Sequence, residues 1–313
     1  MTPPPFKILG IGEILWDLLP SGRQLGGAPA NFVCHAQALG AQARLISRVG
    51  DDDLGREILA RWRALGLPTE TIVIDPQAPT GTVSVELAAD GQPRFTIHEN
   101  VAWDRLTADA TALAAAAEAD AVCFGTLAQR SVAGRRAIGE LLAATRSSAL
   151  RIFDVNLRPP FVDRAVIAES LAEANVLKLN ETELPILAAM FSIDDQLATL
   201  ADRFELRLVA LTRGSAGSLL YADGQSSDHA GLPVQVRDAV GAGDAFTAAV
   251  TLGFLRHWDL ETINQRANEV AAFVCSQAGA TPPLPDEIRR PFGAWPHDAR
   301  AKIATWRNEH SSK

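Results

Sequence analysis

Short apolar segments alternate with longer amphipathic ones along most of the 313 residues. Phe6 to Gly12 and Ala43 to Val49 are apolar runs of strand length, and we expect each to form a buried strand. Between them, Pro29 to Leu39 predicts a helix, with proline at a tolerated first-turn position and Gly40 directly after its end. Strands that alternate with helices in this way form parallel sheets whose crossover helices cover both faces.

The same alternation resumes after residue 108. The Ala-rich segment from Asp109 to Glu118 predicts a helix, and the unbroken apolar run from Ala245 to Leu255 predicts a buried one. Strand-length apolar runs lie between these helices, at Ala121–Gly125, Arg151–Val155, Val176–Leu179, Leu208–Thr212 and Leu232–Val236. We therefore expect an α/β fold, a doubly wound and mostly parallel sheet with helices on both faces.

The pattern changes between about Thr80 and Asp104. Residues 82–87 and 94–98 alternate apolar and polar side chains, and Asp90-Gly91 between them is a hairpin turn signal. Together with a strand from Ile14 to Leu19, these residues predict a small β lid formed from about 13–25 and 80–103. We expect residues 1–313 to form a single domain with this lid and a frayed tail after about Arg307.

Composition and charge narrow the class of protein. The formal net charge of −8 argues against nucleic acid or an anionic membrane as a partner. No apolar run is long enough to cross a bilayer, and the first five residues lack the charged and apolar regions of a signal peptide. The three cysteines lie far apart, without metal-binding spacing, as expected of thiols in a reducing cytosol. We expect a cytoplasmic protein.

The candidate chemistry centres on Gly241-Ala242-Gly243-Asp244, at the start of the buried helix. Small residues allow a close backbone approach, and the first amides of a helix have no internal partner, so the turn is a candidate anion hole. A carboxylate beside an anion hole would repel the anion. The conflict disappears if Asp244 accepts a hydroxyl proton from a second reactant while the turn holds a phosphoryl group. The alternative interpretation is an ordinary helix start with Asp244 as an N-terminal aspartate.

Polar residues follow several of the predicted strands. Asp154 and Asn156 close one strand, Asn180 closes another, and Thr212 with Gly214 closes a third; Asp244 follows a fourth. In an open α/β sheet, ligands bind beyond the carboxyl ends of the strands. Each of these residues is also an ordinary turn residue. Their joint placement favours a binding site at one edge of the sheet.

A second glycine motif, Gly26-Gly27-Ala28-Pro29-Ala30-Asn31, lies near the N-terminus. Together with Gly241-Ala242-Gly243-Asp244 it resembles the paired signatures of the ribokinase family of sugar kinases, also called the phosphofructokinase B type. The resemblance runs from Ile8 to about Pro285. It implies a ribokinase-like fold and transfer of the γ-phosphoryl group of Mg·ATP to a sugar hydroxyl, with Asp244 as general base and Gly241, Ala242 and Gly243 as the anion hole.

The resemblance also implies which residues contact the sugar. Gly26, Gly27 and Asn31 match positions on the sugar side of the site, and Asp17 on the lid strand matches a residue that binds two hydroxyls. Asn156 and Arg158 resemble a segment of the family's fructokinases, in which an arginine can neutralise phosphate charge. Taken alone, Asp17 fits a solvent-facing strand residue, and Arg158 fits one partner of a surface salt bridge.

On the nucleotide side, Asn180 and Glu183 resemble the family's Asn-x-x-Glu motif, which orders Mg²⁺ partly through water. The alternative for this pair is a capping box at a helix start, which is compatible with a role at the metal. The resemblance further places Thr212, Gly214 and Gly217 in a nucleotide loop and Asn268 near adenine, although Asn268 alone fits an exposed helix residue.

Asp238 matches a position that helps bind a monovalent cation in potassium-activated members of the family. Most of the other ligands to that cation are backbone carbonyls, which a sequence does not reveal. The chain departs from the family pattern here, because Ala239-Val240 stands where many members have two threonines. Potassium is therefore expected only as an optional activator.

The segments from Gly12 to Pro20 and from Gln24 to Asn31 are most similar to bacterial fructokinases, so the expected reaction is D-fructose to fructose 6-phosphate. A 2-keto-3-deoxygluconate kinase or a ribokinase is the nearest alternative. A nucleoside kinase would need an aromatic platform, for which the lid offers Trp103 and Phe95.

Two alternatives lie outside the sugar-kinase class. A non-catalytic sugar-binding regulatory protein could share the fold. A nicotinamide oxidoreductase is disfavoured because Leu15 occupies the third glycine position after Gly10-Ile11-Gly12 and no helix clearly follows. A P-loop nucleotide site is not expected either, because the chain contains no Walker A motif. Because an antiparallel insert has exposed strand edges, we also expect a homodimer formed through the lid.

Overall fold

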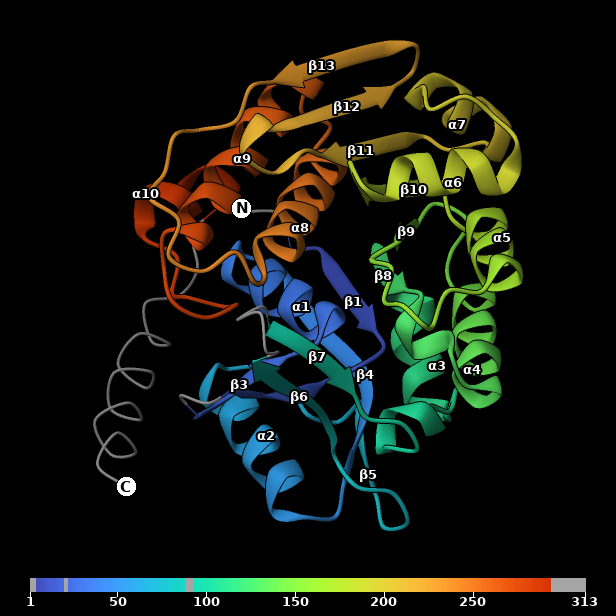
Figure 1. Cartoon of the computed structure of the whole chain (residues 1–313), viewed down its shortest axis with the longest axis vertical. Coiled ribbons are helices and arrows are strands. Elements are labelled where there is room, and N and C mark those ends of the chain that lie inside the picture. The colour runs from blue at the N-terminus through green and yellow to red at the C-terminus, as the bar shows by residue number, and fades with distance from the viewer. Residues whose placement is uncertain (1–3, 20–21, 88–92, 294–313) are drawn as a thin grey trace.

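A nine-stranded sheet forms the centre of the computed structural model, which describes residues 4–19, 22–87 and 93–293. The strand order is β13-β12-β11-β10-β9-β8-β1-β4-β5 (Figure 1), and the strands from β11 to β5 pair in parallel. The strands are β1 (Lys7–Ile11), β4 (Gln42–Gly50), β5 (Ile72–Asp75), β8 (Ala121–Gly125), β9 (Leu150–Asp154), β10 (Val176–Asn180), β11 (Leu208–Thr212), β12 (Ser218–Ala222) and β13 (Gln225–His229). Because parallel strands point the same way, the carboxyl ends of β1, β8, β9, β10 and β11 meet at one edge.

Helices cover both faces of this sheet (Figure 1), which confirms the predicted doubly wound fold. One face carries α1 (Ala28–Ala38), α2 (Asp53–Ala64), α8 (Ala242–Leu255) and α9 (Leu260–Cys275). The other carries α3 (Ala110–Glu118), α4 (Val132–Ala143), α5 (Arg164–Glu173), α6 (Glu183–Phe191) and α7 (Leu197–Phe204). Each face has its own apolar core, because the central strands bury side chains on both sides. A short helix α10 (Asp286–Arg289) follows α9.

A separate four-stranded sheet forms from the segments predicted to make the lid. Its order is β3-β2-β6-β7, with β2 (Leu15–Leu19), β3 (Gly22–Gly26), β6 (Gly81–Leu87) and β7 (Pro93–Ile97). The hairpins β2–β3 and β6–β7 are antiparallel, and β2 and β6 join them in parallel, with Asp17 opposite Gln24 and Val83. Two sequence predictions lie outside the described residues: the Asp90-Gly91 turn and the tail after Arg307.

The predicted strand from Leu232 to Val236 is wrong. These residues belong to no strand, and Leu232, Val234 and Val236 are exposed although they alternate as strand residues do. The edge of the sheet is formed instead by the β12–β13 hairpin, which the pattern did not reveal because the sequence of β13, Gln-Ser-Ser-Asp-His, is almost entirely polar. In the part of the chain that the structure describes, no helix has the length and apolar character needed to span a membrane.

Candidate active site

The two glycine motifs meet through one hydrogen bond. Asp244 lies in the first turn of α8, and Asn31 lies in the first turn of α1, which packs against α8. The Asn31 Nδ2 donates to Oδ2 of Asp244 at 2.8 Å, across a separation of 213 residues. The amide therefore orients the carboxylate that the sequence analysis proposed as a general base.

The surroundings of Asp244 make it a stronger base than an ordinary aspartate. Burial raises its pKa from 3.8 to about 6, and the negative charge of Asp154 contributes in the same direction. The hydrogen bond from Asn31 and the positive charges of Lys178 and Arg158 oppose this shift. Asp244 is therefore ionised at neutral pH, but it holds a proton more readily than a solvent-exposed carboxylate would, which suits a general base.

The turn before Asp244 has the geometry of an anion site. Gly241 has φ 79°, and a Cβ there would lie 2.2 Å from the carbonyl oxygen of Ala280, so only glycine fits. The structure gives no acceptor, anywhere in its described part, for the backbone amides of Gly243 and Asp244. They are the second and third residues of a 14-residue helix, whose dipole adds positive potential. These two amides can bind an anion.

A buried ion pair supports this turn, and sequence analysis did not assign it. The Lys178 Nζ lies 3.1 Å from Oδ1 of Asp154, and Thr247 of α8 donates to Oδ2 of the same carboxylate at 3.0 Å. A Cβ on Gly243 would lie 3.3 Å from the Lys178 Nζ, so the cation lies next to the turn. Burial by itself would lower the pKa of Lys178, but the charges of Asp154, Glu183 and Asp244 outweigh it and raise the pKa, so the lysine stays charged.

The sugar-side residues gather near the lid. Asp17 on β2 is half-buried, and burial raises its pKa to about 6, although the charge of Arg158 opposes the shift. Gly26 lies against Asp17, because a Cβ there would be 2.3 Å from Oδ2. Gly27 has φ 109°, and a Cβ there would be 2.4 Å from the Glu13 carbonyl oxygen, so the backbones approach as closely as glycine allows.

Arg158 is exposed, and its positive charge acts on the carboxylates of Asp17, Glu13 and Asp244. Its Nη1 donates to the carbonyl of Leu157 at 3.1 Å, and the described part of the chain shows no ion pair at this residue. The surface salt bridge considered as an alternative is therefore absent there. Arg158 is therefore a cation whose charge acts on three carboxylates of the predicted sugar side.

Glu13 is a further carboxylate that sequence analysis did not select. It directly follows the apolar segment of β1, is 4% exposed, and accepts a hydrogen bond from the Ala28 amide at 3.2 Å. Burial raises its pKa from 4.5 to about 7. The signal in the sequence was a lone acid between apolar residues at a strand end, just as Lys178 was a lone cation inside an apolar strand.

Residues 22–287 match the sequence profile of the pfkB family carbohydrate kinases. The chain belongs to this family. The fructokinase of Klebsiella pneumoniae is 31% identical over 303 residues, which cover 91% of this chain and 98% of that protein. Fructokinase-1 of Oryza sativa subsp. japonica is 29% identical over 90% of this chain and 95% of its own. A sugar kinase of Pyrococcus horikoshii, solved in complex with ATP, superposes with a TM-score of 0.78 at 29% identity and covers 94% and 99% of the two chains.

In this carbohydrate kinase, Asn180 and Glu183 form the capping arrangement that was the alternative to magnesium binding. The Glu183 carboxylate is buried and accepts the backbone amides of Leu157 and Asn180, both at 2.8 Å. The Asn180 side-chain oxygen accepts the amides of Thr182 and Glu183 in return. No cluster of three or more His, Cys, Asp or Glu side chains suited to a metal occurs among the described residues.

The remaining residues predicted for the nucleotide side lie close to one another. Thr212, Gly214 and Gly217 lie at and after the carboxyl end of β11, where Thr212 pairs with Asn180 of β10. Asn268 of α9 is buried, and its amide donates at 2.7 Å to Oγ of Ser218, the residue that follows Gly217 and pairs with Thr212. It is therefore not the exposed helix residue considered as an alternative, and its assignment to the nucleotide stays a prediction.

The surroundings of Asp238 and Asp244 differ from those expected for a cation ligand and for a residue at a strand end. The carboxylate of Asp238 accepts the amides of Val240 and Gly279, each at 3.0 Å, so both oxygens already have backbone partners. Asp244 does not follow a strand, because residues 231–236 are irregular, although Asp154, Asn156, Asn180 and Thr212 do lie at strand ends. The start of α8, and not a strand end, places Asp244 at this edge of the sheet.

Because the base must be ionised, we expect the kcat/KM of this kinase for its sugar to rise with pH and to level off above pH 6, near the pKa of Asp244. Below that value kcat/KM should fall by about tenfold per pH unit. A profile that stays flat between pH 5 and 8 would contradict the assignment of the base.

The stability of the fold should change in the opposite direction over the same range. Burial raises the pKa of Asp244 from 3.8 to about 6 and that of Glu13 from 4.5 to about 7. Their contribution to stability is therefore fully present below the lower values and is lost as the pH rises through the higher ones. Urea unfolding at each pH separates the two effects, since acid loss of activity through Asp244 would occur without a loss of stability from these groups.

Proposed function

We propose that this protein transfers the γ-phosphoryl group of Mg·ATP to a hydroxyl of D-fructose and forms fructose 6-phosphate. The observation that carries the proposal is the Asn31–Asp244 hydrogen bond, which orients a partly buried carboxylate beside two helix amides that have no acceptor among the described residues. The fructokinases among the relatives, and the Pyrococcus sugar kinase solved with ATP, support the choice of both substrates.

In the proposed reaction, Asp244 accepts the proton of the sugar hydroxyl as the hydroxyl oxygen bonds to the γ-phosphorus. The bond between that phosphorus and the oxygen bridging to the β-phosphate breaks, and ADP leaves with the electron pair. The amides of Gly243 and Asp244 bind the phosphoryl oxygens as negative charge accumulates. Lys178 keeps its charge beside the turn and adds to this stabilisation.

Magnesium would bind mainly through the phosphates of ATP and through water. The residues fit this mode, because Glu183 and Asn180 use their oxygens for backbone amides and leave no ready cage of carboxylates. When bound, the ion neutralises phosphate charge and orients the chain of phosphates. Potassium activation rests on Asp238 alone and stays a prediction.

Several features of the site favour fructose over the alternative acceptors. The sugar side contains the carboxylates of Asp17, Glu13 and Asp244 with Arg158 as the facing cation, so a neutral sugar suits it better than an acidic one. A nucleoside kinase would need an exposed ring, but Trp103 is completely buried. Ribose stays an alternative, since it differs from fructose only in size and hydroxyl pattern.

The test is ADP formation from Mg·ATP with fructose, ribose, 2-keto-3-deoxygluconate and adenosine as acceptors. We expect fructose to have the highest kcat/KM. Turnover with another acceptor alone would move the substrate assignment and leave the mechanism intact. If none of the four is phosphorylated while calorimetry still detects sugar binding, the protein would be better described as a sugar-binding regulator.

We further propose that residues 1–313 act as one kinase domain with its lid at about 13–25 and 80–103, and that the protein works in the cytoplasm.

The lid has β3 and β7 as its two outer strands, and an outer strand can pair with a second copy. We therefore expect a lid-mediated homodimer. Sedimentation at micromolar concentration should show the dimer, and a sample that is entirely monomeric would remove the proposal.

A further inference from the structure

The side chain of Arg130 makes several hydrogen bonds and two aromatic contacts. It lies between η2 (Leu127–Gln129) and α4, and its side chain is 5% exposed. The Nε and Nη2 atoms donate to the two carboxylate oxygens of Asp104 at 2.7 and 2.8 Å, and Nη2 also donates to the carbonyl of His98 at 2.6 Å. The guanidinium therefore fixes His98 in the lid segment and Asp104 directly after it.

The same guanidinium contacts two aromatic rings. Its central carbon lies 4.0 Å from the ring centroid of Trp103 and 4.7 Å from that of Phe161. The remaining guanidinium nitrogen, Nη1, is buried and has no hydrogen-bond partner among the described residues. The contacts of this part of the guanidinium are therefore those with the two aromatic rings. A desolvated cation held against aromatic rings makes a strong and directional contact.

The two rings belong to two different parts of the predicted sugar site: Trp103 contacts the lid, and Phe161 belongs to the segment that contains Arg158. A Cβ on Gly81, the first residue of lid strand β6, would lie 2.2 Å from the Trp103 Nε1, so Trp103 packs directly against the lid. Phe161 belongs to the segment that follows β9 and contains Asn156 and Arg158. Arg130 therefore connects the base of the lid with the segment that presents Arg158.

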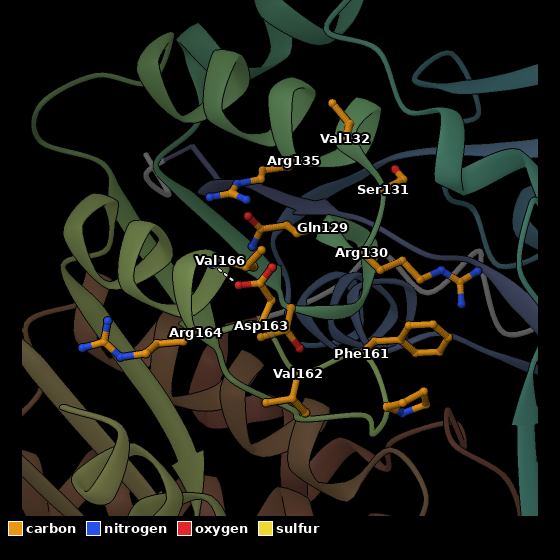
Figure 2. A pocket seen from close by; sticks show the side chains of 12 residues that line it. Gln129, Arg130, Ser131, Val132, Arg135, Phe161, Val162, Asp163, Arg164 and Val166 are labelled. Carbon is orange, nitrogen blue, oxygen red and sulfur yellow. Dashed lines mark hydrogen bonds between the residues drawn. The ribbon is translucent and has the colours of Figure 1, made fainter. Parts of the chain in front are cut away.

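The Phe161 segment packs against the core with Phe161 and Val162 but also borders a cavity. Residues 160–164 line this cavity of about 530 Å³ together with Gln129, Arg130 and Arg135. In Figure 2 the Arg130 guanidinium and the Phe161 ring lie together on one side of this cavity, and Arg135 and Arg164 lie on the other. A segment that borders a cavity can shift into it, so the contact with Arg130 limits where Arg158 can lie.

We propose that Arg130 is a positioning residue for the sugar: through Trp103 and Phe161 it holds the lid and the Arg158 segment at a fixed separation. The inference rests on the proposed function, because the separation matters only if both parts contact the acceptor. Arg130 itself acts through its neighbours and has no assigned contact with either substrate.

The first experiment compares Phe161→Leu, Phe161→Tyr and Arg130→Lys with wild type in steady-state kinetics. Phe161→Leu keeps the Arg130–Asp104 pair, so the fold is retained while the ring contact is lost. We expect the KM for the sugar to rise by about tenfold and the KM for ATP to stay within about twofold. Phe161→Tyr keeps a ring and should show wild-type values. Arg130→Lys also loses the two-point contact with Asp104, so it should raise the sugar KM at least as much as Phe161→Leu does.

Arg135→Ala is the matched control. Arg135 lines the same cavity, but it forms an ion pair with the exposed Glu169 and contacts neither ring. Its replacement should leave both KM values unchanged. A sugar KM for Phe161→Leu within twofold of wild type, or an equal rise in the KM for ATP, would overturn the proposal.

Hydrogen–deuterium exchange tests the connection without any substrate. In Phe161→Leu we expect faster exchange both in residues 156–163 and in residues 96–104, and no change there in Arg135→Ala. Unchanged exchange in residues 156–163 would refute the positioning role whatever the kinetics show. If wild type phosphorylates no sugar but the exchange result appears, the proposed function fails and the connection stands.

Discussion

Replacing Asp244 with asparagine should lower kcat for the sugar by about 10²- to 10⁴-fold, the range that a positioned general base contributes. Asparagine has the same shape but cannot accept the proton. In the wild type, the Asn31 amide donates to the Asp244 carboxylate at 2.8 Å. The side-chain oxygen of an asparagine at this position can accept the same hydrogen bond, so the geometry should persist. ADP formation gives kcat, and calorimetry should give a sugar dissociation constant close to that of wild type.

The control for this variant is Asp259→Asn. Asp259 also begins a helix, because its carboxylate accepts the Thr262 amide at the start of α9, but it is not part of the site. Its replacement should leave kcat unchanged. If Asp244→Asn keeps more than a tenth of wild-type kcat, Asp244 is not the base. If it loses sugar affinity and kcat equally, its role is in binding.

Replacing Lys178 with methionine should lower the free energy of unfolding by about 3–5 kcal/mol, because the change leaves Asp154 charged and buried without its partner. Urea unfolding measures the loss. Since Lys178 also lies beside the turn proposed to bind phosphate, kcat should fall in the same variant. A second change, Asp154→Asn, removes the unpaired charge and should restore part of the stability.

Lys7→Met provides the comparison. Lys7 pairs with Glu118 at 2.7 Å, but both side chains are about half exposed, so solvent screens the attraction. We expect a change below about 1 kcal/mol there. A similarly small change in Lys178→Met would mean that water reaches Asp154 and screens its unpaired charge.

Much of the fold followed from local patterns. The apolar runs at β1, β4, β8, β9, β10 and β11 and the alternation in the lid were sufficient to predict a doubly wound sheet with a separate small sheet. Where a segment's partner decides its structure, the pattern failed. Residues 232–236 alternate like a strand but have no neighbour to pair with, whereas the polar β13 becomes a strand because β12 turns back beside it.

The candidate site divides in the same way. Gly27 and Gly241 were recognisable because close backbone approach and positive φ require glycine, and a local sequence carries that requirement. The partners of the charged groups were not recognisable. Glu13 and Lys178 are charged residues within apolar segments, and such a pattern indicates a functional or structural role. The neighbouring sequence does not, however, identify Ala28 or Asp154 as their partners.

By itself, then, the sequence determined the order of strands and helices, the two glycine motifs and the acid that follows the second one, because backbone conformation and side-chain periodicity depend on neighbours in the chain. Tertiary structure decided that Asn31 meets Asp244 across 213 residues and that Arg130 reaches both Trp103 and Phe161. It also decided how strongly Asp244 holds its proton, since desolvation and nearby charges act through space.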